Sequence, residues 1–213
     1  ESLYRYTRVG LKNAEIKDLG LVDYDEAWKL MSQSILNRSD EGPDEIWFLE
    51  HNPIYTLGQA AFEGNIISEN NIPITRTDRG GQVTYHGPGQ LMIYFLLNLR
   101  RLKWGPKKLI FELESLLIDL LSRYDIQGER VAGAPGIYVN QKKIASIGLK
   151  IKKGFCYHGI SLNIDMDLKP FDNIITCGIE SLEVIQVKDF TEMTMAQVKN
   201  DLMDLLKTNQ IQA

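Results

Sequence analysis

The sequence predicts an α+β domain with a mixed β-sheet and packed helices. Segments with strand composition outnumber segments with helical periodicity, and several strands follow one another with no helix between them. A doubly wound parallel sheet would instead alternate strands and helices along the chain. The chain has 213 residues, of which 44% are hydrophobic, and shows neither a linker nor an internal repeat. We therefore expect residues 1–213 to form one domain.

Three segments have the apolar periodicity of amphipathic helices. The first covers residues 25–37. The second and stronger one covers residues 107–124 and follows Gly105-Pro106, a pair typical of a helix start. The third starts at Thr194, which has the spacing of a capping box with Gln197.

Nine segments rich in β-branched and aromatic residues predict strands. Asn140-Gln141 lies between two of them and predicts a tight hairpin turn. The nine segments are residues 45–50, 54–57, 74–77, 82–85, 91–98, 136–139, 143–151, 157–164 and 183–187.

Composition excludes several classes of protein. The chain has two cysteines, Cys156 and Cys177, too few for a disulfide scaffold, so we expect a reducing compartment. The longest apolar run, residues 91–97, is far shorter than the roughly 20 residues of a membrane span. A net charge of −4 argues against a nucleic-acid-binding protein. The first residues show no secretory signal, so we expect a cytoplasmic location, or a mitochondrial one in a eukaryote.

The charge is unevenly distributed along the chain. Residues 100–153 hold twelve Lys and Arg against five Asp and Glu, a local charge of +7. This cluster predicts docking of an acidic partner, whereas the alternative is a solvated surface on which the charges do not stay together in space. The candidate docking residues are Arg100, Arg101, Lys103, Lys107, Lys108, Lys150, Lys152 and Lys153.

The densest chemical signal is the segment RGGQVTYHGPGQ at residues 79–90. Its four glycines allow the backbone to approach another group closely, and Arg79 and His86 flank the loop. The spacing matches neither a Walker loop nor G-x-G-x-x-G, which argues against a nucleotide site. The alternative interpretation is a set of tight turns without a ligand.

A second signal is a lysine in the predicted strand 143–151. Strict alternation places Lys143 on the face that also carries Ala145, Ile147, Leu149 and Ile151, while Lys142 and Ile144 face the other way. A lysine held in an apolar setting is a candidate acid/base group. The alternative is a lysine whose stem covers the core while its head reaches water.

Each of the two cysteines is a candidate nucleophile. Cys177 precedes Gly178, whose backbone N–H is accessible enough to stabilise a developing oxyanion. Cys156 lies between Phe155 and Tyr157 and is an equal candidate by composition. A small buried hydrophobic residue is the alternative for both. The physical properties of the sequence do not choose between them.

Taken together, these segments resemble the lipoyl(octanoyl) transferase family (LipB type), the octanoyl-[acyl carrier protein]:protein N-octanoyltransferases. The resemblance runs from about Phe48 to Ile179. It is carried by HNPIYTLGQ at residues 51–59, TDRGG at 77–81, RGGQVTYHGPGQ at 79–90, GIYV at 136–139, KIASIG at 143–148, YHGISLNI at 157–164 and ITCGI at 175–179. The resemblance implies the fold of the biotin and lipoate protein ligases. Ser161 and Phe95 replace residues that are often smaller in the family.

The resemblance also implies a catalytic pair, with Cys177 as the nucleophile and Lys143 as its acid/base partner. The acyl-binding residues that it implies are Arg79, Gly80, Gly81, Gln82, Val83, Thr84, Tyr85, His86, Ser146, Ile147, Gly148, Gly159, Ile160 and Ser161. It implies no cofactor and no metal. His51, His86 and His158 are far apart in sequence, so only tertiary convergence would bring them together.

The implied reaction is octanoyl transfer in two steps, from octanoyl-acyl carrier protein to Cys177 and then to a lysine of a lipoyl domain. The acceptors would be the lipoyl domains of 2-oxoacid dehydrogenase E2 subunits and the glycine cleavage H protein. Two alternatives stay open: an ATP-dependent lipoate or biotin protein ligase on the same fold, and a non-catalytic acyl-binding module.

Overall fold

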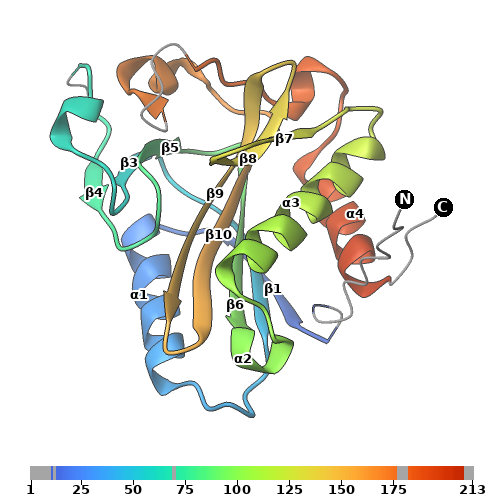
Figure 1. Cartoon of the computed structure of the whole chain (residues 1–213). Coiled ribbons are helices and arrows are strands. Elements are labelled where there is room, and N and C mark those ends of the chain that lie inside the picture. Colours follow the sequence, from blue (N-terminus) through green and yellow to red (C-terminus); the bar gives the residue numbers. More distant parts are fainter. Residues whose placement is uncertain (1–10, 12, 69–70, 177–181, 209–213) are drawn as a thin grey trace.

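The computed structural model describes residues 11, 13–68, 71–176 and 182–208 (Figure 1). The chain forms a seven-stranded mixed sheet, a three-stranded sheet beside it, and helices on both faces of the larger sheet. The prediction of an α+β fold with a mixed sheet is confirmed.

The larger sheet has the strand order β1-β2-β6-β10-β9-β8-β7. Only β1 and β2 run parallel, and the other neighbours are antiparallel. The strands are β1 (Glu15–Leu21), β2 (Glu45–Glu50), β6 (Gln90–Asn98), β7 (Glu129–Val131), β8 (Ala134–Val139), β9 (Lys142–Lys152) and β10 (Phe155–Asn163).

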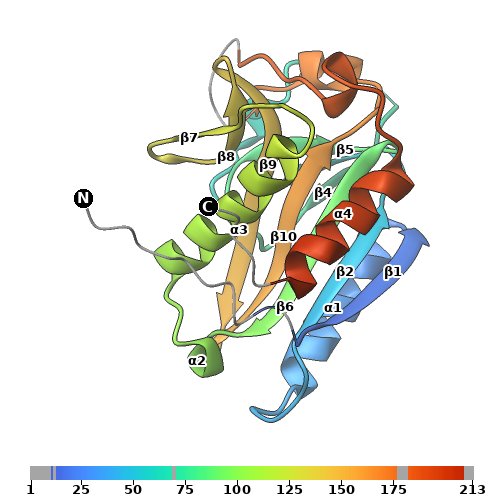
Figure 2. The ribbon, with the colours of Figure 1, turned by 90° about the vertical axis from the view of Figure 1, so that its right-hand side faces the viewer.

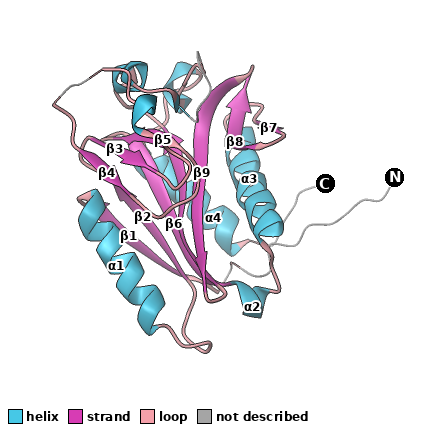
Figure 3. Cartoon of the chain, turned by 60° about the vertical axis from the view of Figure 1, so that its left-hand side comes forward, coloured by secondary structure: helices cyan, strands magenta, loops and turns pink. Residues whose placement is uncertain are grey.

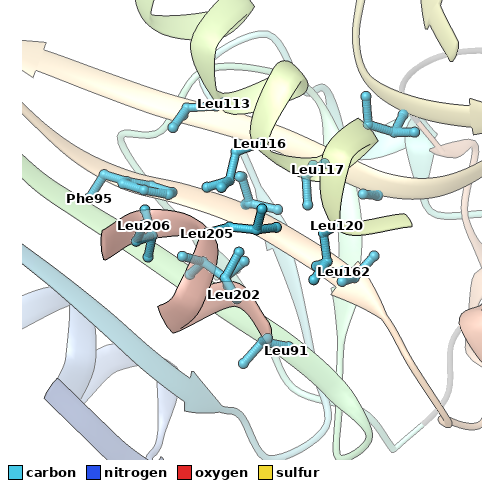
Figure 4. Packing of buried hydrophobic residues seen from close by; sticks show 14 of the residues in the cluster. Leu91, Phe95, Leu113, Leu116, Leu117, Leu120, Leu162, Leu202, Leu205 and Leu206 are labelled. Carbon is cyan, nitrogen blue, oxygen red and sulfur yellow. The ribbon is translucent and has the colours of Figure 1, made fainter. Parts of the chain in front are cut away.

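Strand β6 lies inside the sheet and is buried on both faces. Its odd-numbered apolar residues, such as Phe95, pack against α3 (Pro106–Ser122) and α4 (Met195–Lys207) (Figures 2 and 4). Its even-numbered residues, such as Tyr94, pack against α1 (Tyr24–Asn37) on the opposite face (Figure 3). The period of two along a strand thus produces two cores.

The smaller sheet has the order β4-β3-β5, formed by β3 (Ile54–Leu57), β4 (Ile74–Arg76) and β5 (Val83–His86). Tyr55, Tyr85 and Phe171 form its own apolar cluster. The glycine-rich segment, residues 79–90, contains β5, so the position of this sheet decides where that segment lies.

Local sequence signals agree with the structure at several element ends. Thr194 caps α4 and forms the reciprocal capping box with Gln197. Asn140 and Gln141 both have positive φ, at 50° and 67°, as a type I′ hairpin turn requires. The three predicted helices are present, with ends shifted by one or two residues, and a short helix, α2 (Leu99–Leu102), precedes α3.

The predicted strand at residues 183–187 is wrong. Val184 makes an isolated parallel bridge to Lys143, and the chain then enters a 3-10 turn at Val187–Asp189. Conversely, β1 and β7 were not predicted. Both are edge strands with largely exposed side chains, so neither has a clear apolar alternation. In the described part of the chain, no helix is both long and apolar enough to cross a membrane.

Candidate active site

A cavity of about 700 Å³ lies where the glycine-rich segment meets β9 and β10. Thirteen of the fourteen acyl-binding residues implied by the sequence line it, and so does Lys143. The thirteen are Arg79, Gly80, Gly81, Gln82, Val83, Thr84, His86, Ser146, Ile147, Gly148, Gly159, Ile160 and Ser161. Cys177 lies outside the described residues.

Tyr85 is the exception among the implied acyl-binding residues. Its ring packs into the core of the smaller sheet, with centroids 5.6 Å from Tyr55 and 5.5 Å from Phe171. The alternation along β5 explains this, because Thr84 and His86 face the cavity side while Tyr85 faces the other way. Tyr85 therefore does not line the cavity, unlike the other implied acyl-binding residues.

The structure adds cavity-lining residues that the sequence interpretation missed. Met92 and Tyr94 come from the α1 face of β6. The available signal was the period of two along this strand, which places them on the face opposite to Ile93 and Phe95. The others come from helices, turns and the outer half of β9: Tyr24, Gln59, Pro106, Ile110, Gly133, Ala134, Pro135, Leu149, Lys150 and Ile151. Of the two departures from the family pattern, Ser161 lines the cavity, whereas Phe95 lies in the opposite core.

The Arg79 side chain holds the glycine-rich segment in place. Arg79 is buried, and its Nη2 donates to the Thr56 carbonyl at 2.7 Å and to the Gln82 carbonyl at 2.9 Å. The Gly80 N–H donates to the Leu149 carbonyl on β9 at 2.8 Å. A Cβ on Gly148 would lie 3.1 Å from the Gly80 oxygen, so glycine at position 148 allows this close approach.

Lys143 is buried in the cavity wall, with 3% of its surface exposed. Its Nζ donates to the Pro135 carbonyl at 3.2 Å and lies 5.2 Å from the centre of the Tyr138 ring. A Cβ on Gly136 would lie 2.9 Å from Lys143 Cε, so this glycine leaves room for the lysine stem. The structure favours the buried lysine over the alternative of a head that reaches water.

Strict alternation does not explain the burial of Lys143. Between Lys143 and Ala145, the register of β9 against β8 shifts by one residue, which makes Ile144 the extra residue of a bulge. Ile144 is fully buried in the core between the larger sheet and α3, together with Ala145, although strict alternation predicted that the two side chains lie on different faces. The prediction that Ile144 and Ala145 lie on opposite faces of β9 is therefore wrong, because the extra residue of a bulge interrupts the alternation of side chains.

The three histidines come together at the cavity, and two of them, His86 and His158, line it. The ring centroids of His51 and His86 are 5.9 Å apart, and both rings lie against Tyr24. His51 Nε2 pairs with Tyr94 Oη at 2.7 Å, and His158 Nε2 pairs with Asp78 Oδ1 at 2.8 Å. Among the described residues, no group of three or more His, Cys, Asp or Glu side chains has the arrangement of a metal site.

Burial disfavours the charged form of all three histidines. Burial lowers the pKa of His51 to about 4 and holds the pKa of His86 well below its usual value. Burial also lowers the pKa of His158, although Asp78 opposes the shift. For Asp78, burial raises the pKa, but hydrogen bonds from His158, Tyr157 and Trp28 outweigh it and lower the pKa to about 2. At neutral pH Asp78 is therefore ionised and accepts hydrogen bonds from Tyr157 and Trp28 and pairs with His158.

The local charge of +7 is partly neutralised in space. Within the part of the chain that the structure describes, six of the twelve basic residues at 100–153 form ion pairs, mostly with acidic residues from other segments, such as Arg100 with Asp40 and Arg101 with Asp44. The others are Lys108 with Glu112, Arg123 with Asp201 and Asp204, Arg130 with Glu114, and Lys142 with Glu183. Sequence clustering therefore overestimates the basic surface, and Arg100, Arg101 and Lys108 are weaker docking candidates than expected.

Comparison with known proteins places the chain in a family. Residues 23–207 match the model of the lipoyl protein ligase A/B catalytic domain. An octanoyltransferase of Dechloromonas aromatica (strain RCB) is 53% identical over 175 residues, covering 82% of this chain and 85% of that protein. An octanoyltransferase of Vibrio campbellii (strain ATCC BAA-1116) is 45% identical over 202 residues, covering 92% of each chain.

Solved structures show the same fold at low sequence identity. A lipoate-protein ligase A bound with ATP aligns with a TM-score of 0.76 at 14% identity, covering 91% of this chain and 83% of that one. The biotin protein ligase of Aquifex aeolicus in complex with biotin and ATP aligns with a TM-score of 0.57 at 11% identity, covering 92% and 69%. With its residues 23–207 matched by the family model and close relatives aligned over most of its length, the chain belongs to the lipoyl protein ligase A/B catalytic domain family.

Proposed function

We propose that the protein transfers an octanoyl group from octanoyl-acyl carrier protein to a lysine of lipoyl domains, in the cytoplasm, with Cys177 as nucleophile and Lys143 as acid/base. The observation that supports this most is Lys143, buried in the wall of a cavity lined by the glycine-rich segment. The names of the relatives, octanoyltransferases at 45–53% identity, support the acyl group.

In the first proposed step, the thiolate of Cys177 attacks the carbonyl carbon of the donor thioester. The new C–S bond forms as the bond to the carrier sulfur breaks, and the ammonium of Lys143 gives its proton to the departing thiolate. In the second step, the amine of the acceptor lysine attacks the Cys177 thioester. An amide bond forms, the Cys177 sulfur leaves as a thiolate, and Lys143 takes up the proton that the amine loses.

A thioester is already an activated acyl donor, so the proposed reaction requires no nucleotide. The rival ligase function rests on the likeness to ligase structures, which at 11–14% identity shows the fold alone. A non-catalytic acyl-binding module would explain the cavity but gives no reason for a buried lysine in its wall.

We expect octanoylation of a lipoyl domain from octanoyl-acyl carrier protein with neither ATP nor Mg²⁺, and no product from free octanoate plus ATP. The measurement is the mass of the lipoyl domain after incubation under each condition. Product only from octanoate plus ATP would identify a ligase and contradict the role given to Cys177. Octanoate binding without product in either reaction would favour the acyl-binding module.

The remaining basic residues support docking of acidic protein substrates beside the cavity. Lys150 lines the cavity, and Lys152 and Lys153 follow it at the exposed end of β9. Lys103 and Lys107 are exposed at either side of the turn into α3, whose Pro106 and Ile110 also line the cavity. No ion pair within the described residues involves these five lysines.

The double substitution Lys152→Glu/Lys153→Glu is expected to raise KM for octanoyl-acyl carrier protein on the order of tenfold, because charge complementarity speeds association. KM for a small octanoyl thioester should not change. Lys29→Glu, an exposed reversal on α1, is the matched control and should leave both values unchanged. An equal rise of KM for the carrier-bound and the small donor would contradict docking at this surface.

A further inference from the structure

Lys143 lies where one pairing partner of β9 gives way to another. The last residue pair between β10 and β9 is Leu162 with Ala145, so β10 ends before it reaches Lys143. The chain at residues 183–185 takes its place. Lys143 N–H donates to the Glu183 carbonyl at 2.8 Å, and Ile185 N–H donates to the Lys143 carbonyl at 2.9 Å. The backbone of Lys143 therefore depends on a segment that forms no regular strand.

One side chain ties that segment to the sheet. Asn163, the last residue of β10, is buried, and its Nδ2 donates to the Ile185 carbonyl at 3.0 Å. Its Oδ1 accepts from Gln90 Nε2 at 2.9 Å, across the β6–β10 pair. Asn163 thus lies at the end of β10 and links residues 183–185 to strand β6.

The hydrogen bonds of Asn163 continue to the glycine-rich segment. His86 Nδ1 lies 2.7 Å from Gln90 Oε1, and His86 Nε2 lies 3.2 Å from Thr56 Oγ1, which accepts from Arg79 Nη2 at 2.7 Å. Because the Gln90 amide donates to Asn163, its oxygen accepts the proton of His86 Nδ1. Hydrogen bonds then run in one direction, from Arg79 through Thr56, His86, Gln90 and Asn163 to the Ile185 carbonyl, and each group donates to the next. This direction requires a neutral His86 ring, and the lowered pKa of His86 agrees with it.

We infer that Asn163 is a positioning residue for Lys143: through the Ile185 carbonyl it holds residues 183–185 against Lys143 and so fixes the lysine in the cavity wall. Asn163 does not line the cavity, so it does not contact the acyl group. Its effect on the reaction passes through the backbone of Lys143. This inference rests on the proposed function, because it assigns Asn163 to the acid/base chemistry of Lys143.

The test is the pH profile of Cys177 alkylation by iodoacetamide in the full chain. Asn163→Leu keeps a similarly branched side chain and removes both hydrogen bonds without adding a charge. We expect the alkylation rate at pH 7 to fall on the order of tenfold and its midpoint to move to higher pH, because a displaced ammonium stabilises the thiolate less. For a small octanoyl thioester, kcat should fall while KM stays unchanged.

Asn98→Leu is the matched control. Asn98 is a buried asparagine at the opposite end of β6, where its side chain caps α2 and contacts Asp40. Its substitution should lower thermal stability without moving the alkylation profile. Should Asn163→Leu not fold, Asn163→Ala removes the same two hydrogen bonds and gives the same readout. Loss of the fold in both variants would make Asn163 a residue of fold stability and overturn the inference.

Lys143→Ala in the same assay separates the two proposals. If Lys143→Ala moves the alkylation profile and both Asn163 variants leave it unchanged, the positioning role is wrong while the catalytic pair stands. If Lys143→Ala leaves the profile unchanged, the proposed pairing of Lys143 with Cys177 is itself wrong. A shift in the Lys143 and Asn163 variants, with none in Asn98→Leu, is the result that we expect.

Discussion

Incubation with octanoyl-acyl carrier protein is expected to place the octanoyl group on Cys177 and to leave Cys156 unmodified. Cys156 is fully buried on β10, and its Sγ donates to the Phe95 carbonyl at 3.3 Å. Burial raises the pKa of the Cys156 thiol to about 12, so its thiolate fraction at pH 7 is on the order of 10⁻⁵. Cys156 therefore lacks both access and nucleophilicity, which leaves Cys177 as the proposed nucleophile.

Peptide mapping of the acylated protein identifies the modified cysteine. Cys177→Ala should abolish both the covalent adduct and transfer to the lipoyl domain. Cys156→Ala should keep both, with only the loss of stability that a small cavity in the α3 core causes. An octanoyl group on the peptide that contains Cys156, or transfer that persists in Cys177→Ala, would contradict the proposed mechanism.

Lys143→Ala is expected to slow octanoyl transfer by about 10²–10⁴-fold, the usual contribution of a general acid–base group. The fold should persist, because the backbone hydrogen bonds of Lys143 to Glu183 and Ile185 do not involve its side chain. Single-turnover rates of acyl-enzyme formation and of amide formation measure the effect on each step. Both should fall, since each proposed step moves a proton through Lys143.

Lys142→Ala is the matched control for this prediction. Lys142 is the neighbouring residue, carries the same charge and forms a partly exposed ion pair with Glu183. Exposed ion pairs contribute little to stability, so this substitution should change the transfer rate less than about threefold. Equal rates for the two alanine variants would remove Lys143 from the mechanism.

The sequence predicted well those features that depend on neighbouring residues. The Thr194 capping box and the Asn140-Gln141 turn are set by a few adjacent side chains and backbone angles, and the structure has both. The amphipathic helices are similar cases, because one turn of apolar residues identifies the buried face. About half of the cavity-lining residues were also predicted, mainly from the family resemblance.

Features that depend on tertiary pairing could not be predicted in the same way. The Ile144 bulge arises from the register of β9 against β8, and nothing in residues 142–146 marks it. Among the described residues, half of the charges of the basic cluster form ion pairs, among them Arg100 with Asp40, which lies 60 residues away in the sequence. Asn163 lies within the family motif at residues 157–164, but its role could not be predicted, because that role depends on where β10 ends and which segment then replaces it beside Lys143.

The position of β6 inside the sheet bears on how the chain folds. The residues that pair between β6 and β10 are far apart in the sequence. Asn98 and Phe155 are separated by 57 residues, and Gln90 and Asn163 are separated by 73 residues. Contacts of such high sequence separation form slowly, because the loop-closure entropy is lost before they form. Until β10 is in place, a strand with nine buried positions and no charged side chain is exposed along one edge. During synthesis, residues 90–98 are therefore a segment of the sheet at risk of aggregation.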